Sequence, residues 1–89
     1  MISDIEKRRK QLLYRATYRG FKEADIVVGG FARAHLADMD MEQLDAFAEL
    51  LEVNDRQLYA WIMGNTPEPA EFAGPVLEEM KKFRPSLDS

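Results

Sequence analysis

Residues 19–25 read Arg-Gly-Phe-Lys-Glu-Ala-Asp and place one guanidinium and two carboxylates around a glycine. A guanidinium offers a rigid fork of N–H donors and carboxylates accept such bonds, so this set suits charge-assisted recognition of another molecule. Gly20 ends a strongly helical run, and we expect it in the left-handed conformation that commonly closes a helix. Folding alone does not account for so many charges in one turn. We therefore predict a recognition surface whose contact residues include Arg19, Gly20, Glu23 and Asp25.

Phe21 directly follows the glycine and is expected to lie on an exposed turn. A bulky apolar side chain is hard to bury there. An apolar contact flanked by charges is a common design of binding hot spots. Phe21 therefore joins the predicted partner-binding residues.

The sequence shows no pattern typical of catalysis. It has no cysteine and one histidine, His35, which excludes disulfides, thiol chemistry and cysteine-bound zinc. Ser3, Ser86 and Ser89 all lie beside the chain ends, which gives no basis for a Ser-His-Asp arrangement. Gly29-Gly30 lacks the spacing of a phosphate-binding loop. We predict that the chain is not an enzyme and binds no metal and no cofactor on its own.

Charge is unevenly distributed along the chain, whose net charge is −4. Residues 1–22 carry seven basic and two acidic side chains, whereas residues 23–89 carry five basic and fourteen acidic ones. The asymmetry favours an oriented encounter with a charged partner or, alternatively, a basic first helix packed on an acidic body. The Lys-Arg-Arg-Lys run at 7–10 raises nucleic-acid binding as an alternative. The acidic body and the lack of a helix bearing base-reading side chains argue against it.

No apolar run approaches the roughly 18–20 residues that span a bilayer. The basic N-terminal segment lacks the apolar stretch of a secretory signal. We expect no membrane insertion and a cytoplasmic location.

Hydrophobic spacing predicts an all-α fold, a small compact bundle of about five short helices in a single domain over residues 1–89. The predicted helices cover residues 3–19, 23–35, 40–51, 54–64 and 75–84. Capping-box spacing predicts the starts at Ser3 and Asp40, and Asn54 is a typical N-cap. Gly64 is expected to end the fourth helix, and Pro75 to lie in the first turn of the fifth. The ends of the chain are expected to be frayed.

The third predicted helix has the clearest apolar stripe, formed by Met41, Leu44, Phe47, Ala48 and Leu51. In the second, Gly29 and Gly30 each cost about 1 kcal/mol relative to alanine, so they favour close helix–helix approach or a local distortion. Trp61 is expected in the core.

The order of these motifs resembles the SdhE family, the succinate dehydrogenase assembly factors that promote flavinylation. The 19–25 segment has the form RGxxExD and follows a basic helix containing Leu12-Leu13-Tyr14-Arg15. Downstream come Phe31-Ala32, a helix ending in Leu50-Leu51-Glu52, and the run Leu58-Tyr59-Ala60-Trp61-Ile62. The resemblance covers roughly residues 8–84, nearly the whole chain.

The resemblance implies a small helical protein that binds the flavoprotein subunit of succinate dehydrogenase or of the related fumarate reductase. There it would assist covalent attachment of FAD to a histidine of that partner. The family motif falls on Arg19, Gly20 and Glu23, with Asp25 in its extended form, whereas Phe21 rests on the chemical argument alone. We expect a monomer that carries no flavin site of its own. The alternatives are a small nucleic-acid-binding regulator and a generic protein-interaction module.

Overall fold

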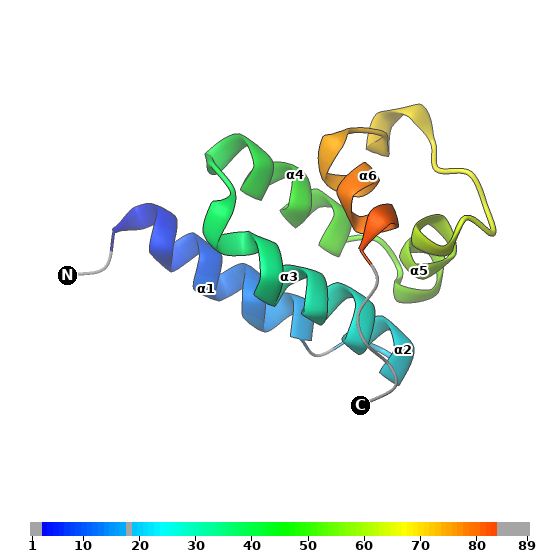
Figure 1. Ribbon diagram of the computed structural model, residues 1–89, viewed down its shortest axis with the longest axis horizontal. Helices are drawn as coiled ribbons and strands as arrows, with labels where there is room; N and C mark the ends of the chain where they lie inside the picture. Colours follow the sequence, from blue (N-terminus) through cyan, green and yellow to red (C-terminus); the bar gives the residue numbers. More distant parts are fainter. Residues whose placement is uncertain (1–2, 18, 84–89) are drawn as a thin grey trace.

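The computed structural model describes residues 3–17 and 19–83, which form a bundle of short helices (Figure 1). The helices are α1 (Asp4–Thr17), α2 (Lys22–Ala24), α3 (Gly30–His35), α4 (Met41–Leu51), α5 (Asp55–Met63) and α6 (Pro75–Lys82). No strand occurs in these described residues. The predicted all-α fold is confirmed.

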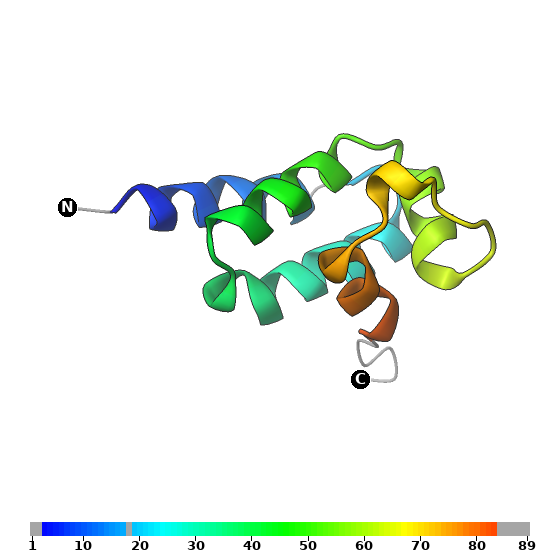
Figure 2. The ribbon, with the colours of Figure 1, turned by 90° about the horizontal axis from the view of Figure 1, so that it is seen from above.

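Helices α1 and α4 pack side by side and run in the same direction, while the helix that contains α2 and α3 returns in the opposite direction (Figures 1 and 2). Helix α6 packs against both α4 and α5. The largest fully buried side chains come from five helices and the segment between α2 and α3: Leu12, Val28, Phe31, Leu44, Phe47, Leu58, Ile62, Leu77 and Met80. One core therefore joins the elements that hold the 19–25 segment in place.

The second helix is continuous from α2 to α3 but contains a π-helical turn over Asp25–Gly29. A π turn inserts one extra residue into the helix, which shifts the faces on either side of it. A Cβ built on Gly29 would lie 3.4 Å from the carbonyl oxygen of Ala16 and 3.5 Å from Cα of Thr17. The glycine pair was expected to favour close helix–helix approach or a local distortion. Gly29 lies both in the π turn and at the close contact with α1.

Four of the predicted helix boundaries agree with the caps in the structure. Asp40 and Gln43 form a complete capping box at α4, and Asn54 accepts bonds from the first amides of α5. Gly64 ends α5 in the left-handed conformation with φ 79°, and Pro75 begins α6. Local cap chemistry therefore fixes these boundaries.

Two predicted details differ from the structure, and one turn was not predicted. The first helix was predicted to reach residue 19 but ends at Thr17, and Tyr18 lies outside the described residues. Met41 was assigned to the apolar stripe of α4 but is 45% exposed, because it is the first residue of that helix. The connector before α6 contains a 3₁₀ turn at Ala70–Phe72, and Phe72 packs against the buried Trp61 with ring centroids 5.3 Å apart. The expected C-terminal fraying falls on residues that are not described.

Candidate partner-binding site

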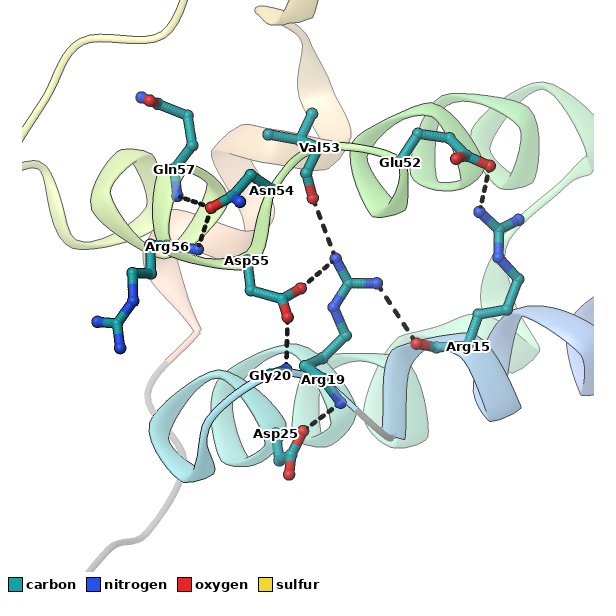
Figure 3. Close-up of polar contacts among 10 residues, drawn as sticks. All are labelled: Arg15, Arg19, Gly20, Asp25, Glu52, Val53, Asn54, Asp55, Arg56 and Gln57. Carbon is teal, nitrogen blue, oxygen red and sulfur yellow. Dashed lines mark hydrogen bonds and ion pairs between the residues drawn. The ribbon is translucent and has the colours of Figure 1, made fainter.

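The guanidinium of Arg19 points into the bundle, and its side chain is only 9% exposed (Figure 3). Its Nη2 lies 2.7 Å from Oδ1 of Asp55 and donates to the carbonyl of Val53 at 3.2 Å. Its Nη1 donates to the carbonyl of Arg15 at 3.4 Å. The arginine therefore joins the end of α1 to the start of α5. The guanidinium is therefore not exposed as expected, because its Nη1 and Nη2 are bound to Asp55 and two backbone carbonyls and its Nε is buried. Its role in partner binding stays a prediction.

Gly20 is exposed, and its N–H donates to Oδ2 of the same Asp55 carboxylate. Its φ does not lie in the left-handed region, so the conformational reason predicted for this glycine is wrong. The structure gives another reason, since a Cβ at this position would lie 2.5 Å from Oδ2 of Asp55. Any side chain at position 20 would therefore displace this carboxylate, which Arg19 holds in place.

The two carboxylates of the 19–25 segment lie differently. Asp25 is half-buried, and its Oδ1 accepts the backbone N–H of Arg19. This bond closes the turn, so folding accounts for Asp25 as well as for Arg19. Glu23 is exposed on α2. Within the predicted set, Gly20 and Glu23 therefore face solvent, and Arg19 and Asp25 hold the turn.

Phe21 is half-buried, contrary to the expectation that this position is hard to bury. Its ring meets Tyr59 edge to face, with centroids 5.3 Å apart and an interplanar angle of 78°. The guanidinium of Arg56 lies over the same ring, with Cζ 5.0 Å from its centroid. The turn thus rests on α5 through an aromatic pair as well as through Asp55.

Asp55 organises the turn but is absent from the predicted site. In the sequence it is the residue after the N-cap Asn54, where an acidic side chain is typical for reasons of the helix dipole alone. Its bond to Gly20 spans 35 positions. A local pattern cannot reveal such a pairing. The pairing of Asp55 with Gly20 becomes visible only once the packing of α5 beside the turn is known.

Further ion pairs connect α1 to α4. Arg8 lies 3.3 Å from Asp45, and Arg15 lies 2.6 Å from Glu52. Arg9 donates to the carbonyls of Leu36 and Met39. The basic first helix therefore packs on an acidic body, which was one of the two explanations for the charge asymmetry.

The remaining candidate groups form no second site. His35 stacks on Phe31 with centroids 4.6 Å apart and meets Phe83 edge to face, so aromatic packing accounts for it. Residues 3–17 and 19–83 contain no group of three or more histidine, cysteine or acidic side chains placed to hold a metal ion. Nor do these residues include a helix that is long and apolar enough to cross a membrane.

The described residues thus form a small helical bundle whose braced 19–25 turn leaves Gly20 and Glu23 exposed. The chain belongs to the Sdh5 family, the flavinator of succinate dehydrogenase, whose sequence profile matches residues 10–84. The resemblance to succinate dehydrogenase assembly factors seen in the sequence is thereby confirmed.

Individual relatives agree with this assignment. The chain is 39% identical over 77 residues to the FAD assembly factor SdhE of Acetobacter pasteurianus, covering 86% of this chain and 71% of that protein. It is 38% identical over 77 residues to the mitochondrial succinate dehydrogenase assembly factor 2 of Dictyostelium discoideum, covering 86% of this chain and 55% of that one. The factor of the same name in Candida glabrata is 34% identical over 83 residues, or 89% of this chain and 54% of its own length. The chain thus spans about half the length of these mitochondrial relatives.

Proposed function

We propose that this protein binds the flavoprotein subunit of succinate dehydrogenase and promotes covalent attachment of FAD to it. The observation that carries the proposal is membership of the flavinator family over residues 10–84. The names of the relatives, an FAD assembly factor and succinate dehydrogenase assembly factors, point to the same activity. Fumarate reductase is a second flavoprotein on which the same surface is proposed to act.

The proposed contact surface is the 19–25 turn. Gly20 and Glu23 are exposed and available to a partner, and Phe21 contributes the uncovered part of its ring. Arg19 and Asp25 support this surface from within, because both are bound to other parts of the turn. The five residues predicted from the sequence thus divide into contact and supporting roles.

The proposed mechanism is positioning. Bond formation between a flavin and a histidine requires the two reactants in one productive geometry, and holding that geometry can supply a large part of the barrier reduction. A turn fixed by an ion pair, two backbone amides and an aromatic contact loses little conformational freedom on binding. In this proposal the protein acts as a cytoplasmic monomer, performs no chemistry itself and meets FAD only within the partner.

The nucleic-acid alternative has less support than the protein-binding proposal. Arg8 and Arg15 are paired with carboxylates, and Arg9 is bound to backbone carbonyls. These cations are already engaged within the bundle, whereas nucleic-acid affinity depends on cations free to replace the counterions of phosphates.

The test uses the purified flavoprotein subunit without bound FAD, to which FAD is added with and without this protein. Covalent flavin is followed over time by in-gel fluorescence. We expect Glu23→Gln to slow the reaction about tenfold, because a charge-assisted contact contributes about 1.5–3 kcal/mol. The matched control Glu78→Gln removes an exposed carboxylate from α6 and should change the rate less than about twofold. Equal rates with and without the wild-type protein would reject the proposed function.

A further inference from the structure

Arg56 lies at the edge of the 19–25 turn, where its guanidinium covers the Phe21 ring, and the proposed contact surface above does not include it. It is the second residue of α5, and its side chain is exposed and points away from the Arg19–Asp55 pair (Figure 3). Its guanidinium lies over Phe21, whose ring is fixed by its edge-to-face contact with Tyr59. A cation over an aromatic face is attracted by the ring quadrupole. The bundle therefore holds this cation in a defined place at the surface.

The polar contacts of Arg56 distinguish it from the arginines of α1. Arg8 and Arg15 each pair with a carboxylate of the acidic body. Among residues 3–17 and 19–83, the guanidinium of Arg56 has no hydrogen-bond or ion-pair partner, and it lies over the Phe21 ring. The contact with the ring gives the N–H donors of the guanidinium no oxygen acceptor. Within the described residues, no acceptor uses its N–H donors.

We propose that Arg56, seated on Phe21, binds a carboxylate on the surface of the partner protein. This inference rests on the proposed function and adds a specificity residue to its contact surface. A guanidinium matches a carboxylate in a bidentate geometry, and prior placement on a ring reduces the ordering cost of that bond. In this proposal Arg56 contacts the partner directly, whereas Arg19 positions the turn.

A single acidic side chain fits this surface better than a polyanion does. Glu23 is exposed on α2, which packs against α5, and the whole chain carries a charge of −4. The negative potential of the protein repels a densely charged polyanion such as DNA. At physiological salt, screening keeps this potential from strongly affecting a local ion pair between one guanidinium and one carboxylate. The partner chemistry is therefore an acidic residue on a folded protein.

The experiment is a calorimetric titration of the purified flavoprotein subunit with the wild-type protein, Arg56→Gln, Arg56→Lys and the control Lys7→Gln. Lys7 is exposed on α1, and its removal lowers the net charge by the same amount. It lies about 15 Å along the helix from the last residue of α1, which separates it from the turn. We expect about tenfold weaker binding for Arg56→Gln, an intermediate loss for Arg56→Lys, and less than a twofold change for Lys7→Gln.

Two further measurements make the result specific. The difference between the wild type and Arg56→Gln should shrink as salt is raised to about 0.5 M, because screening weakens an exposed ion pair. In a Phe21→Leu background, Arg56→Gln should cost only about threefold, since the ring no longer holds the guanidinium.

The outcomes separate this inference from the function on which it rests. No binding by the wild-type protein would reject the proposed function. Binding by the wild type, with Arg56→Gln indistinguishable from Lys7→Gln, would reject the role of Arg56 alone. If Arg56→Gln weakens binding by the same factor in the wild type and in the Phe21→Leu background, the Phe21 ring does not hold the guanidinium in place for the partner.

Discussion

The carboxylate of Asp55 bonds at once to the guanidinium of Arg19 and to the backbone N–H of Gly20. The side chains of Arg19 and Asp55 are 9% and 27% exposed, so the pair is largely removed from water. A charge left alone in such a place costs far more than the loss of a surface ion pair. The stability of the turn therefore depends on Asp55 more than on the exposed pairs of α1.

We predict that Asp55→Ala lowers the free energy of unfolding by about 2 kcal/mol, because Arg19 then keeps its burial but loses its anion. The control Asp45→Ala removes the partner of Arg8, where the side chains are 34% and 65% exposed. It should cost less than about 0.5 kcal/mol. Urea denaturation of both variants gives the comparison, and equal losses would contradict this account of the turn.

The residue types of the site could be predicted from the sequence, but their roles could not. The charges and the glycine at 19–25 singled out this segment, and its role in partner binding stays a prediction. Whether Arg19 faces solvent or the bundle depends on Asp55, which belongs to another helix. Gly20 was predicted for its backbone freedom, whereas the structure shows that a Cβ there would displace the Asp55 carboxylate. Only the position of that carboxylate reveals this.

At the scale of elements, the contact of the second helix with α1 is controlled by Gly29. This residue ends the π turn and is buried, with backbone atoms of Ala16 and Thr17 at 3.4 and 3.5 Å from a Cβ placed on it. Those distances are ordinary contact for one methyl group but leave no space beyond it. The size of the side chain at this position thus decides how closely the two helices approach.

We predict that Gly29→Ala changes the free energy of unfolding by less than about 1 kcal/mol. The gain in helix propensity is about 1 kcal/mol at most, and the new methyl group would lie at the near limit of ordinary contact with the backbone of α1. Gly29→Val should destabilise by about 2 kcal/mol, since its added methyl groups would press on the backbone of α1. Thermal and urea unfolding measure both variants. A valine variant as stable as the alanine one would mean that the helices separate without cost.

Helices were the most predictable elements, because apolar spacing and cap residues act over three or four positions. Asp40 and Asn54 begin their helices as predicted, and Gly64 ends one. The π turn could not be predicted, since one extra residue leaves the run of apolar side chains nearly unchanged. Its site was marked only by two glycines that suit several kinds of distortion.

At the scale of the whole molecule, charge helps to assemble the bundle. Arg8 and Arg15 of α1 pair with acidic residues on α4 and just after it, and Arg19 in the following turn pairs with Asp55 on α5. A separate ion pair closes the other end of the bundle. There Nζ of Lys81 on α6 donates to both carboxylate oxygens of Glu68 at 2.8 Å. Glu68 lies in the connector between α5 and α6, so this pair ties the connector to the last helix.

This closing pair predicts a pH dependence of stability. The hydrogen bond from Lys81, together with a backbone hydrogen bond, holds the pKa of Glu68 below its ordinary value of 4.5. A carboxyl whose pKa is lower in the folded than in the unfolded state stabilises the fold above the unfolded pKa. That contribution is lost as pH falls through the folded pKa. The same bond raises the pKa of Lys81 above 10.5, so the lysine stays charged throughout the acid range.

We therefore predict that Glu68→Gln unfolds at a lower temperature than the wild type at pH 7, and that the difference disappears as the pH is lowered below 4.5 through the depressed pKa of Glu68. Melting curves from pH 8 to pH 3 measure the difference. Glu71→Gln is the matched control, because Glu71 is exposed on the neighbouring turn, and it should match the wild type throughout. A difference between Glu68→Gln and the wild type that persists unchanged at pH 3 would show that the side chain stabilises the connector by packing and not by its charge.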